Sequence, residues 1–559
     1  MLLAIFVLAV LLRVVALGTQ GLWTDEALTI VLSNWPVSDL FLRPIDPTPA
    51  LYYVIHKALI PANASLEAVR SISVVAGVMS VGLIYLLGRL AFGAAGGLLA
   101  AALLAVWSAH VDYSQEARAY SLLFLLTLLT SLGLVYFAHA LRQAAGQPSQ
   151  LDRGRRWFAL ALFCIGNILA FYTHVIATFW IVLTSLLLLA IVWRERRHHW
   201  PQLFAVFGIM AVGAAPGIYR LVLQMRAGDQ FHWLGQADLI EFANTSATVF
   251  LPVGLWDNPL TNALGARGIA EVVVAAASLA LLGAGCWFGR QALYRSVKGR
   301  PVIFWLILAY LMVPVAVWLF GFIARPLFID RTILFAVPGM ILLITAVCLA
   351  LGRRVAARAA IGVVLLYSAS TLSFGIVREK EDWRGAYTYL AATASPTDVI
   401  AVCPLYNYPA LRYHAVSPVA SAVLGMAGDG RLLEVEHGLG TNPDWDKTYF
   451  RHLLVPEAAR WRLTAQDVHV PALLDLRPGQ SIWRVEGHCN PGFADDLDAA
   501  LNAISPDPDI AWSQKRKDPR AFSVTVRRYR VVAPVTLDVQ DIAAHPQSLP
   551  PFLSSARVP

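Results

Sequence analysis

The stretch MLLAIFVLAVLLRVVALGTQGLWTDEALTI, residues 1–30, decides the fold, because an apolar run is followed at once by two adjacent acids. The apolar run is long enough to cross a bilayer, which takes about 20 helical residues. Asp25 and Glu26 then lie at the edge of the membrane, where charged groups are costly to keep and often functional. Arg13, near the end of the run, is expected to extend its side chain toward the lipid headgroups.

The whole chain has the composition of an integral membrane protein. Of its 559 residues, 57% are hydrophobic and 14% are charged, whereas a soluble domain carries roughly 25% charged residues. Apolar runs recur up to about residue 377 and then stop. We therefore predict a membrane all-α domain of about eleven transmembrane helices, near residues 1–18, 69–88, 91–107, 119–140, 157–173, 175–193, 201–221, 268–289, 301–323, 332–351 and 359–377.

Basic residues divide the loops between these spans into two sets. They are concentrated in the loops that alternating spans place on one side, and by the positive-inside tendency this side is the cytoplasm. The N-terminus is then cytoplasmic, and the acidic pair and everything after residue 377 lie outside. The net charge of +8 reflects this distribution and gives no indication of nucleic acid binding. The basic loop residues are Arg142, Arg153, Arg155, Arg156, Arg194, Arg196, Arg197, Arg290, Arg295, Lys298, Arg300, Arg353, Arg354 and Arg358.

Residues 378–559 are predicted to form a soluble α/β domain on the outer face, separate from the membrane domain of residues 1–377. Strand-like runs such as DVIAVC (398–403) and SIWRVE (481–486) have the β-branched and apolar residues of buried strands. The run DWRGAYTYLAATA (382–394) has helical spacing. This alternation of the two patterns is typical of a small α/β domain.

The five cysteines divide between the two domains. Cys164, Cys286 and Cys348 lie inside predicted spans, where a thiol is expected to pack as a small apolar group. Cys403 and Cys489 follow strand-like runs in the exported domain, where an oxidising compartment permits a disulfide. Sequence alone cannot supply the geometry that such a bond requires, so the pairing is left open.

The first outer loop, residues 19–68, can be interpreted in two ways. In TDEALTIVL, Thr24 stands where the N-cap of a helix would be, and Asp25 and Glu26 fall in the first turn. The acids thus satisfy the rules for a helix start. The alternative is that they belong to a functional site at the membrane edge.

Three further outer segments carry charged residues at the membrane boundary. In WSAHVDYSQEARAYSLL (107–123), Asp112, Glu116 and Tyr120 repeat every four residues and would share a helix face near Arg118. An ion-paired helix start is the alternative interpretation of this segment. The other two segments, ARPLFIDRTILF (324–335) and FYTHVIATF (171–179), contribute Arg325, Asp330, Arg331 and His174.

Acids, bases and arginines at headgroup depth are the groups that a site needs to hold a lipid phosphate and to activate a neighbouring hydroxyl. A polytopic transporter is an alternative, because charged residues at membrane depth also mark transport paths. The acids here gather on one face, and the sequence shows no internal repeat of the kind that many transporters have. A non-catalytic envelope assembly protein is a further alternative, in which the exported domain would be the working part.

Four segments in order, LWTDEALT (22–29), DPTPALYYVIHK (46–57), LEAVRSISVVAGVMSVGLIYLLGRLAFG (66–93) and YSQEARAYSLL (113–123), carry a resemblance to a known family. In order and spacing they resemble the bacterial branch of the protein O-mannosyltransferase superfamily. These proteins are polytopic C-type glycosyltransferases and include the aminoarabinose transferases that modify lipid A. The resemblance covers roughly the first 140 residues well and is weaker afterwards.

The resemblance implies a C-type glycosyltransferase fold with periplasmic interfacial helices, in a bacterial inner membrane with its catalytic face and C-terminal domain in the periplasm. The sugar donor would be carried on a polyprenyl phosphate, because nucleotide sugars are confined to the cytoplasm. The acceptor would be a hydroxyl of a glycolipid, a polysaccharide or an exported protein. The sequence specifies neither the sugar nor the acceptor, and it does not define the oligomeric state.

In this family the acidic pair of the first loop is the catalytic hallmark, and it matches Asp25 and Glu26. We expect one inverting displacement, with Asp25 as the base for the acceptor hydroxyl and Glu26 orienting that acid or helping to hold a metal. Donor and phosphate binding is expected from cationic and aromatic side chains, namely Lys57, Arg118, Arg331, Arg325, Tyr52, Tyr53 and Tyr120. A second acidic or acceptor site would use Asp112, Glu116, His174 and His56. The residues that could hold a divalent metal are Asp25, Glu26, Asp112, Glu116 and His174.

Overall fold

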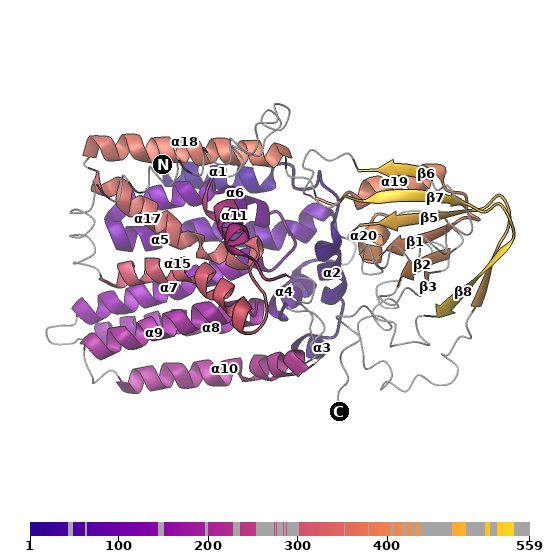
Figure 1. The fold of residues 1–559 in the computed structure, drawn as a ribbon. Helices are drawn as coiled ribbons and strands as arrows, with labels where there is room; N and C mark the ends of the chain where they lie inside the picture. Colours follow the sequence, from indigo (N-terminus) through magenta and orange to yellow (C-terminus); the bar gives the residue numbers. More distant parts are fainter. Residues whose placement is uncertain are drawn as a thin grey trace.

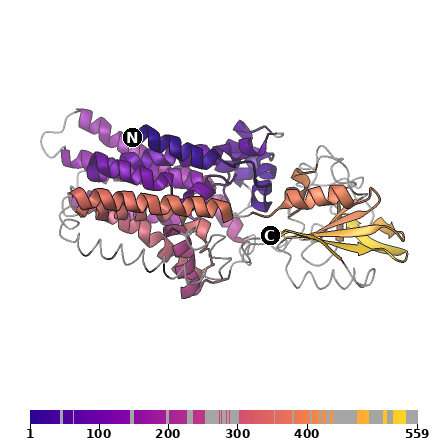
Figure 2. The same ribbon diagram turned by 90° about the horizontal axis from the view of Figure 1, so that it is seen from above.

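The computed structural model shows a bundle of long helices, a layer of short helices at one end of it, and a sheet domain beyond that layer (Figure 1). A view from above shows the sheet domain set off from the bundle along its long direction (Figure 2). The residues that the structure describes are 1–42, 48–61, 64–143, 150–195, 200–226, 235–252, 301–351, 353–377, 380–403, 407–415, 420, 422–426, 432–436, 472–487, 509–514 and 523–541, with four single positions between 253 and 300.

The chain is a multi-pass helical membrane protein. In the described residues, seven helical runs are long and apolar enough to cross a membrane. They are α5 (Leu66–Ala105), α7 (Tyr120–Gln143), α8 (Gln150–Thr173), α10 (Trp200–Arg226), α15 (Pro301–Ile323), the continuous run of α16 (Asp330–Ile333), η3 (Leu334–Ala336) and α17 (Val337–Ala350), and α18 (Arg353–Val377). Two shorter apolar helices are α1 (Leu2–Val14) and α9 (Ala177–Glu195).

These helices confirm the predicted membrane architecture at a coarse level. The predicted span 69–88 lies within α5, and the span 91–107 overlaps the same helix up to its end at Ala105. Each of the other spans except 268–289 overlaps one helical run. The span 268–289 lies outside the described residues. The count of eleven crossings therefore stays a prediction.

Helix α5 consists of two arms that meet at Gly93, which has a positive φ of 83°. Such a φ is accessible to glycine at little steric cost. The arms pack closely, because a Cβ on Gly97 would lie 2.7 Å from the backbone oxygen of Tyr85. A Cβ on Gly88 would lie 3.0 Å from the backbone oxygen of Gly96. Residues on opposite sides of Gly93 are thus in backbone contact, so α5 accounts for two adjacent predicted spans.

The buried position of Arg13 corrects the expectation that its side chain extends to the headgroups. The guanidinium is fully buried and donates hydrogen bonds to the backbone oxygens of Ala9, Leu104 and Ala105. It also lies 2.8 Å from His110 Nδ1. The last carbonyl groups of a helix lack partners within that helix, so the end of α5 offers Arg13 acceptors inside the bundle.

Three short helices form the layer beside the sheet domain (Figure 1), namely α2 (Thr24–Ser33), α3 (Val37–Leu42) and α4 (Leu51–Leu59). A further short helix, α6 (Ser108–Tyr113), packs within the bundle against α5 and α18. The predicted helix start at Thr24 is confirmed, but the N-cap is Trp23, and the Thr24 hydroxyl bonds to the C-terminal domain instead. The predicted helix face of Asp112, Glu116 and Tyr120 is wrong, because α6 ends at Tyr113 and α7 begins at Tyr120.

The C-terminal part contains a mixed sheet, as the alternating patterns predicted. The strand order is β4-β8-β3-β2-β1-β5-β7-β6, with β1 parallel to both β2 and β5. The predicted strands of 398–403 and 481–486 appear as β1 and β5, and the predicted helix of 382–394 appears as α19. The element bounds are α19 (Trp383–Thr393), β1 (Val399–Cys403), α20 (Tyr408–Tyr413), β2 (Ala422–Met426), β3 (Leu432–Glu436), β4 (Ala472–Leu476), β5 (Ser481–Glu486), β6 (Asp509–Ser513), β7 (Thr525–Arg530) and β8 (Val535–Asp541).

The three cysteines that the structure describes have the states that the sequence predicted for the membrane part and the C-terminal part. Cys164 and Cys348 are free and buried. Cys403 is disulfide-bonded. Its predicted partner, Cys489, lies outside the described residues, as does Cys286, so the pairing with Cys489 stays a prediction.

The sheet domain and the short helices share one apolar core. Leu22, Ala27 and Val31 of the membrane part belong to the same buried cluster as Trp383 and Leu411 of the C-terminal part. Polar contacts reinforce this interface: the Leu22 backbone N–H donates to His414 Nε2 (3.1 Å), and Arg384 donates to the backbone oxygens of Gly18 and Thr19. The C-terminal domain is therefore docked on the segment that carries the acidic pair.

The close contact in α5 gives a stability prediction. Gly97→Ala should lower the free energy of unfolding by about 1–3 kcal/mol, because its Cβ must push two backbones apart. Gly208→Ala is the matched control, since a Cβ at Gly208 in α10 would meet nothing within 4 Å and alanine is the better helix former. Thermal unfolding in one detergent measures both variants, and equal midpoints for the two would contradict the packing of the arms.

The contact of His414 gives a pH prediction. Burial, with the nearby charges of Arg384 and Arg70, lowers the pKa of His414 from 6.5 to about 4 against the opposing charge of Glu26. The neutral ring accepts the Leu22 N–H, so protonation removes the acceptor. An undocked His414 takes up a proton near pH 6.5 and the docked one only near pH 4, so docking should weaken as the pH falls through this window.

Hydrogen exchange of residues 19–33 at pH 7 and pH 5 measures the effect. His414→Gln keeps an acceptor without titrating and should abolish it; an unchanged pH dependence in this variant would exclude His414 as the cause.

Candidate active site at the acidic pair

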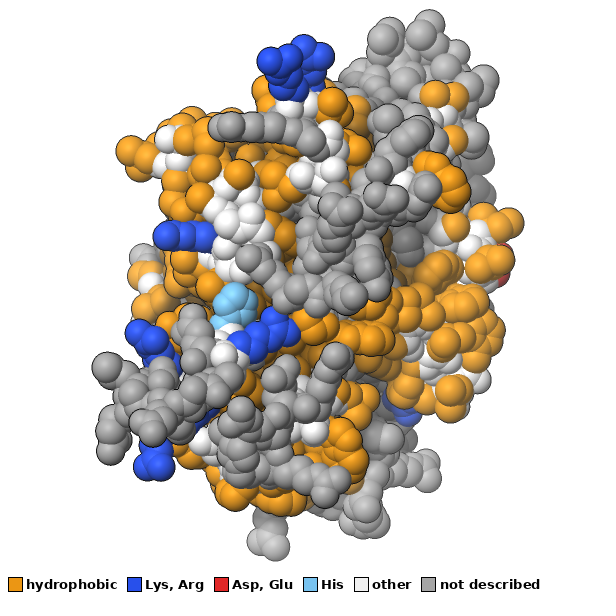
Figure 3. Space-filling model, turned by 90° about the vertical axis from the view of Figure 1, so that its left-hand side faces the viewer, with side chains coloured by type: hydrophobic (Ala, Val, Ile, Leu, Met, Phe, Trp, Pro, Cys, Tyr) orange, Lys and Arg blue, Asp and Glu red, His pale blue; other side chains and the backbone are white. Residues whose placement is uncertain are grey.

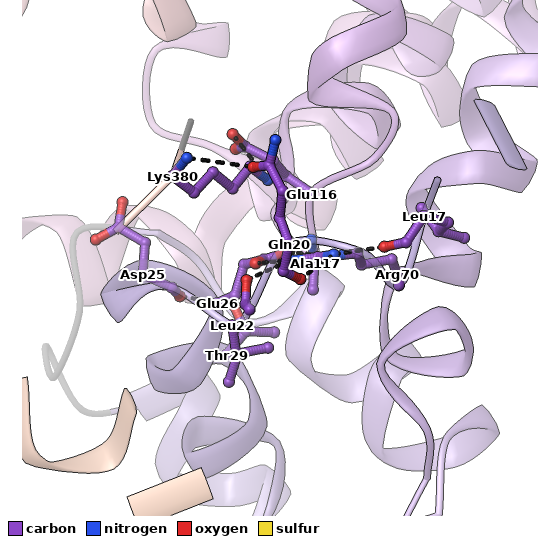
Figure 4. A network of polar contacts seen from close by, with 12 residues as sticks. Leu17, Gln20, Leu22, Asp25, Glu26, Thr29, Arg70, Glu116, Ala117 and Lys380 are labelled. Atoms are coloured by element: carbon purple, nitrogen blue, oxygen red, sulfur yellow. Dashed lines mark hydrogen bonds and ion pairs between the residues drawn. The ribbon is translucent and has the colours of Figure 1, made fainter. Parts of the chain in front are cut away.

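The two acids of the pair point in different directions. Successive residues of a helix differ by about 100° around its axis, and Figure 4 shows the carboxylates of Asp25 and Glu26 directed apart. The Glu26 side chain is fully buried, whereas that of Asp25 is 27% exposed. The pair therefore combines one internal carboxylate with one that is open to a substrate.

Glu26 is bound from two sides. Arg70, from the first arm of α5, donates from Nε to Oε1 (2.8 Å) and from Nη2 to Oε2 (2.7 Å). The Ala117 backbone N–H donates to Oε1 as well (2.8 Å). Burial would raise the pKa of Glu26, but Lys380 and the charge and hydrogen bonds of Arg70 lower it overall. Glu26 is therefore an ionised structural anchor.

Arg70 uses its remaining donors on the chain that leads into α2. Its Nη1 donates to the backbone oxygens of Leu17 (2.5 Å) and Gln20 (3.2 Å), and its Nη2 donates to that of Gly21 (3.0 Å). One guanidinium thus ties the segment after α1 to the first turn of α2. Sequence reasoning missed Arg70, although a charged residue near the start of an apolar span is a signal that could have found it.

Asp25 forms an ion pair with Arg331. The Arg331 Nη1 lies 2.9 Å from Asp25 Oδ2, and both side chains are partly exposed. Arg331 follows Asp330, whose Oδ1 accepts the Arg331 backbone N–H (2.8 Å) and whose Oδ2 accepts the Tyr113 hydroxyl (2.6 Å). The structure thus brings two residues that sequence analysis selected separately into direct contact.

Arg118 also contacts Asp25. Its Nη1 donates to the backbone oxygen of Asp25 (3.2 Å) and lies 3.5 Å from the Tyr53 hydroxyl, and its Nη2 lies 3.4 Å from Thr48 Oγ1. The Tyr52 hydroxyl lies 2.8 Å from Ser73 Oγ. Two guanidinium groups from different segments therefore contact Asp25, and guanidinium groups are well suited to bind a phosphate.

Aromatic side chains adjoin this group. Tyr120 packs edge-on against Tyr113, with ring centroids 5.4 Å apart, and its ring lies 5.7 Å from that of His174. Burial, assisted by the charges of Arg118 and Arg331, lowers the pKa of His174 to about 3. His174 is therefore neutral at ordinary pH, and its Nδ1 accepts the Ile176 backbone N–H (3.2 Å).

Glu116 is the third carboxylate of the group and pairs with Lys380, at 3.5 Å between Oε1 and Nζ. Burial and the neighbouring Glu26 raise the pKa of Glu116, and Lys380 opposes them. Lys380 belongs to the segment between α18 and the sheet domain, and Figure 4 shows it reaching into the cluster. No sequence pattern marks Lys380, because its partner is far away along the chain.

Four further predicted site residues are Lys57, His56, Arg325 and Asp112. Lys57 is exposed and donates to the backbone oxygens of Asn34 and Trp35, at the opposite end of α2; nine residues of helix separate the two ends by about 14 Å. His56 is buried beside Tyr52, and burial lowers its pKa to about 4. Arg325 is half-buried in the link between α15 and α16. Asp112 is half-buried in α6.

The predicted metal-binding set is not assembled in the structure. Within the ranges that the structure describes, which include all five predicted ligands, no group of three or more His, Cys, Asp or Glu side chains is placed to hold a metal ion. The physical reason is that basic side chains take the positions beside the acids. They pair Arg331 with Asp25, Arg70 with Glu26 and Lys380 with Glu116.

The arrangement of membrane helices and C-terminal sheet is similar to the fold of ArnT, which agrees with the resemblance given by the sequence. ArnT from Cupriavidus metallidurans in the apo state aligns with 94% of this chain and 97% of its own, at 13% identity and a TM-score of 0.51. ArnT bound to undecaprenyl phosphate aligns over the same shares at 12% identity and 0.48. The Archaeoglobus fulgidus oligosaccharyltransferase AglB, in complex with an inhibitory peptide and a dolichol-phosphate, covers 87% of this chain and 69% of its own, at 13% identity and 0.39. No protein-family model and no curated protein sequence matches the chain.

The different environments of the two acids give a prediction. Glu26→Gln leaves the buried Arg70 guanidinium without its anionic partner and should lower the free energy of unfolding by about 3–5 kcal/mol. Asp25→Asn breaks a partly exposed pair and should lower it by less than about 1 kcal/mol. Thermal denaturation of both variants in one detergent tests this difference. Equal losses would show that the two acids do not have separate roles.

Proposed function

We propose that this protein transfers a glycosyl group from a polyprenyl-phosphate-linked sugar to an acceptor hydroxyl of a glycolipid, a polysaccharide or a protein. The observation that carries the proposal is the partly exposed Asp25 carboxylate, paired with Arg331 and fixed by the buried Glu26–Arg70 contact at one end of the membrane bundle. The fold shared with ArnT supports the same class of reaction. A polyprenyl phosphate is the donor that such a site would meet within the membrane.

The proposed chemistry is one inverting displacement at the anomeric carbon. The acceptor oxygen forms a bond to this carbon while the bond to the phosphate oxygen breaks, and the acceptor proton passes to Asp25. A base of this kind contributes about 10² to 10⁴ in rate. The polyprenyl phosphate leaves as an anion, and fixed guanidinium groups stabilise the charge that develops on it.

Arg331 and Arg118 are the residues we assign to that phosphate, because both contact Asp25. Arginine can bind two phosphate oxygens at once through its planar fork. Tyr53 lies 3.5 Å from Arg118, and Tyr120 packs against Tyr113, whose hydroxyl bonds to Asp330 beside Arg331. Both Tyr53 and Tyr120 would line the donor path. Lys57, Arg325 and Tyr52 remain donor-binding candidates, and a second or acceptor site is assigned to Asp112, Glu116, His174 and His56.

The charge distribution supports the proposed orientation in the membrane. Figure 3 shows the end of the bundle opposite the sheet domain, where Lys and Arg side chains are spread over the described surface and acidic ones are nearly absent. By the positive-inside tendency this end would face the cytoplasm. The acidic cluster and the C-terminal domain would then lie in the periplasm of a bacterial inner membrane.

The position of the acids also favours an enzyme over the two other candidates. A transporter needs charged groups along a path through the membrane, whereas this cluster lies at one end of the bundle, between the helices and the sheet domain. A scaffold protein has no need of a partly exposed carboxylate held beside two guanidinium groups. We therefore propose an enzyme ahead of a transporter or a scaffold protein.

The test is turnover by Asp25→Asn. Purified protein is given a panel of polyprenyl-phosphate sugars with candidate acceptors, and the lipid phosphate released is measured. We expect Asp25→Asn to lower turnover by about 10² or more because the base is lost, with Thr388→Ala on the exposed face of α19 as the unchanged control. Undiminished turnover in Asp25→Asn would remove the base from the mechanism. Solute flux in sealed vesicles without any lipid-linked sugar would instead indicate a transporter.

A further inference from the structure

The segment Lys380–Trp383, here called the strap, joins the membrane part to α19 and contacts the surroundings of α2. The Lys380 backbone N–H donates to Gln20 Oε1 (3.2 Å), and its ammonium pairs with Glu116. Glu381 Oε2 accepts from Thr24 Oγ1 (2.7 Å) and from Trp383 Nε1 (2.7 Å). Two successive residues of the strap thus contact different partners around α2: Lys380 contacts Gln20 and Glu116, and Glu381 contacts Thr24.

Thr24 is the residue to which the strap is joined. It is the first residue of α2, immediately before Asp25, and it is buried. Its hydroxyl has a single proton and two acceptors within hydrogen-bond distance, Glu381 Oε2 at 2.7 Å and Asn407 Oδ1 at 2.9 Å. Glu381 and Asn407 both belong to the C-terminal part, so this part holds the Thr24 hydroxyl from two positions.

The acceptors of Thr24 are themselves fixed. The Asn407 amide nitrogen donates to the backbone oxygens of Cys403 and Gly487, which orients its oxygen toward Thr24. Cys403 ends β1 and is disulfide-bonded. The carboxylate of Glu381 is oriented by the buried Trp383 indole. A continuous set of hydrogen bonds therefore runs from the central strand of the sheet to the residue before Asp25.

Asp25 thus stands between two anchored neighbours. Glu26 is held on the membrane side by Arg70, and Thr24 is held on the other side by Glu381 and Asn407. Because a helix turn moves as a unit, these anchors determine where the Asp25 carboxylate points. A misplacement of about 1 Å can lower the rate of a reaction about 10²-fold.

We propose that the C-terminal domain is a working part of the active site, and that Thr24, Glu381 and Lys380 are positioning residues which aim Asp25 at the acceptor hydroxyl. This inference rests on the proposed function and adds to it the role of the exported domain. None of the three residues needs to touch the substrate. Their effect reaches the reaction through the orientation of α2 and through the charge beside Glu26 and Glu116.

The first test compares Thr24→Val with Thr24→Ser in the full-length protein. Valine keeps the shape and loses the hydroxyl, and we expect it to lower kcat about tenfold with little change in KM for the lipid donor. Serine keeps the hydroxyl and should restore most of kcat. Thr388→Ala is the control, because the Thr388 hydroxyl lies on the exposed face of α19 and donates to the Arg384 backbone oxygen of its own helix. A normal kcat in Thr24→Val, or an equal loss in Thr388→Ala, would overturn the proposal.

The second test asks whether Thr24 and Glu381 act through one contact. The double variant Thr24→Val with Glu381→Gln should lose no more activity than the more affected single variant, since residues in one hydrogen bond are not additive. Losses that multiply would show that the two residues act separately and would contradict the strap mechanism.

The third test uses the charge of Lys380. Lys380→Met should shift the pH profile of kcat toward higher pH, because Lys380 lowers the pKa values of Glu26 and Glu116, which also face Arg70, Arg331 and Asp25. Lys380→Arg should restore the profile. An unchanged profile in Lys380→Met would leave this lysine without a positioning role. If Asp25→Asn is also fully active in the same assay, the proposed function itself is wrong, so the two failures can be told apart.

Discussion

The buried contact between Glu26 and Arg70 is the interaction on which the site depends. A guanidinium and a carboxylate removed from water lose hydration that their mutual attraction offsets only when the geometry is good and the other polar atoms are bonded. Here Arg70 meets Glu26 with two hydrogen bonds and the carbonyl groups of residues 17–21 with the rest. The Ala117 backbone N–H, from another loop, donates a further hydrogen bond to the Glu26 carboxylate. The contact therefore joins four segments at one point and fixes the register of α2.

This anchor explains how two adjacent acids acquire different roles. Successive side chains of a helix point about 100° apart around its axis. When Glu26 is fixed toward the interior, Asp25 therefore faces outward. The sequence shows the pair but does not show which member is internal. That choice is made by Arg70, which lies 44 positions from Glu26. A long-range partner of this kind cannot be inferred from local pattern, because helix-start rules treat both acids alike.

The membrane helices could be predicted because lipid imposes a simple constraint. Backbone groups in the hydrocarbon region need internal hydrogen bonds, so each long apolar run must be a helix. Strands of the C-terminal domain were also predictable where β-branched residues cluster, as in Val399–Cys403. Predictions failed where tertiary partners override local pattern. Arg13 finds carbonyl groups inside the bundle, and the 112–120 segment breaks its helix around Glu116, which the structure places beside Lys380.

The three ion pairs of the cluster differ in how readily a ligand could rearrange them. Glu26–Arg70 is fully buried, and Glu116–Lys380 is nearly so, so breaking either leaves a buried charge without its partner at high energetic cost. Asp25–Arg331 is the partly open pair, at 27% and 20% exposure. In the proposed reaction an incoming phosphate competes with Asp25 for Arg331, and each hydrogen bond that the phosphate gains is one that Asp25 loses. A carboxylate with fewer donors is a stronger base, so binding of the donor would itself prepare Asp25 to accept the proton of the acceptor. The same substrate that supplies the leaving group would thus activate the base, while the two buried pairs keep the site in place.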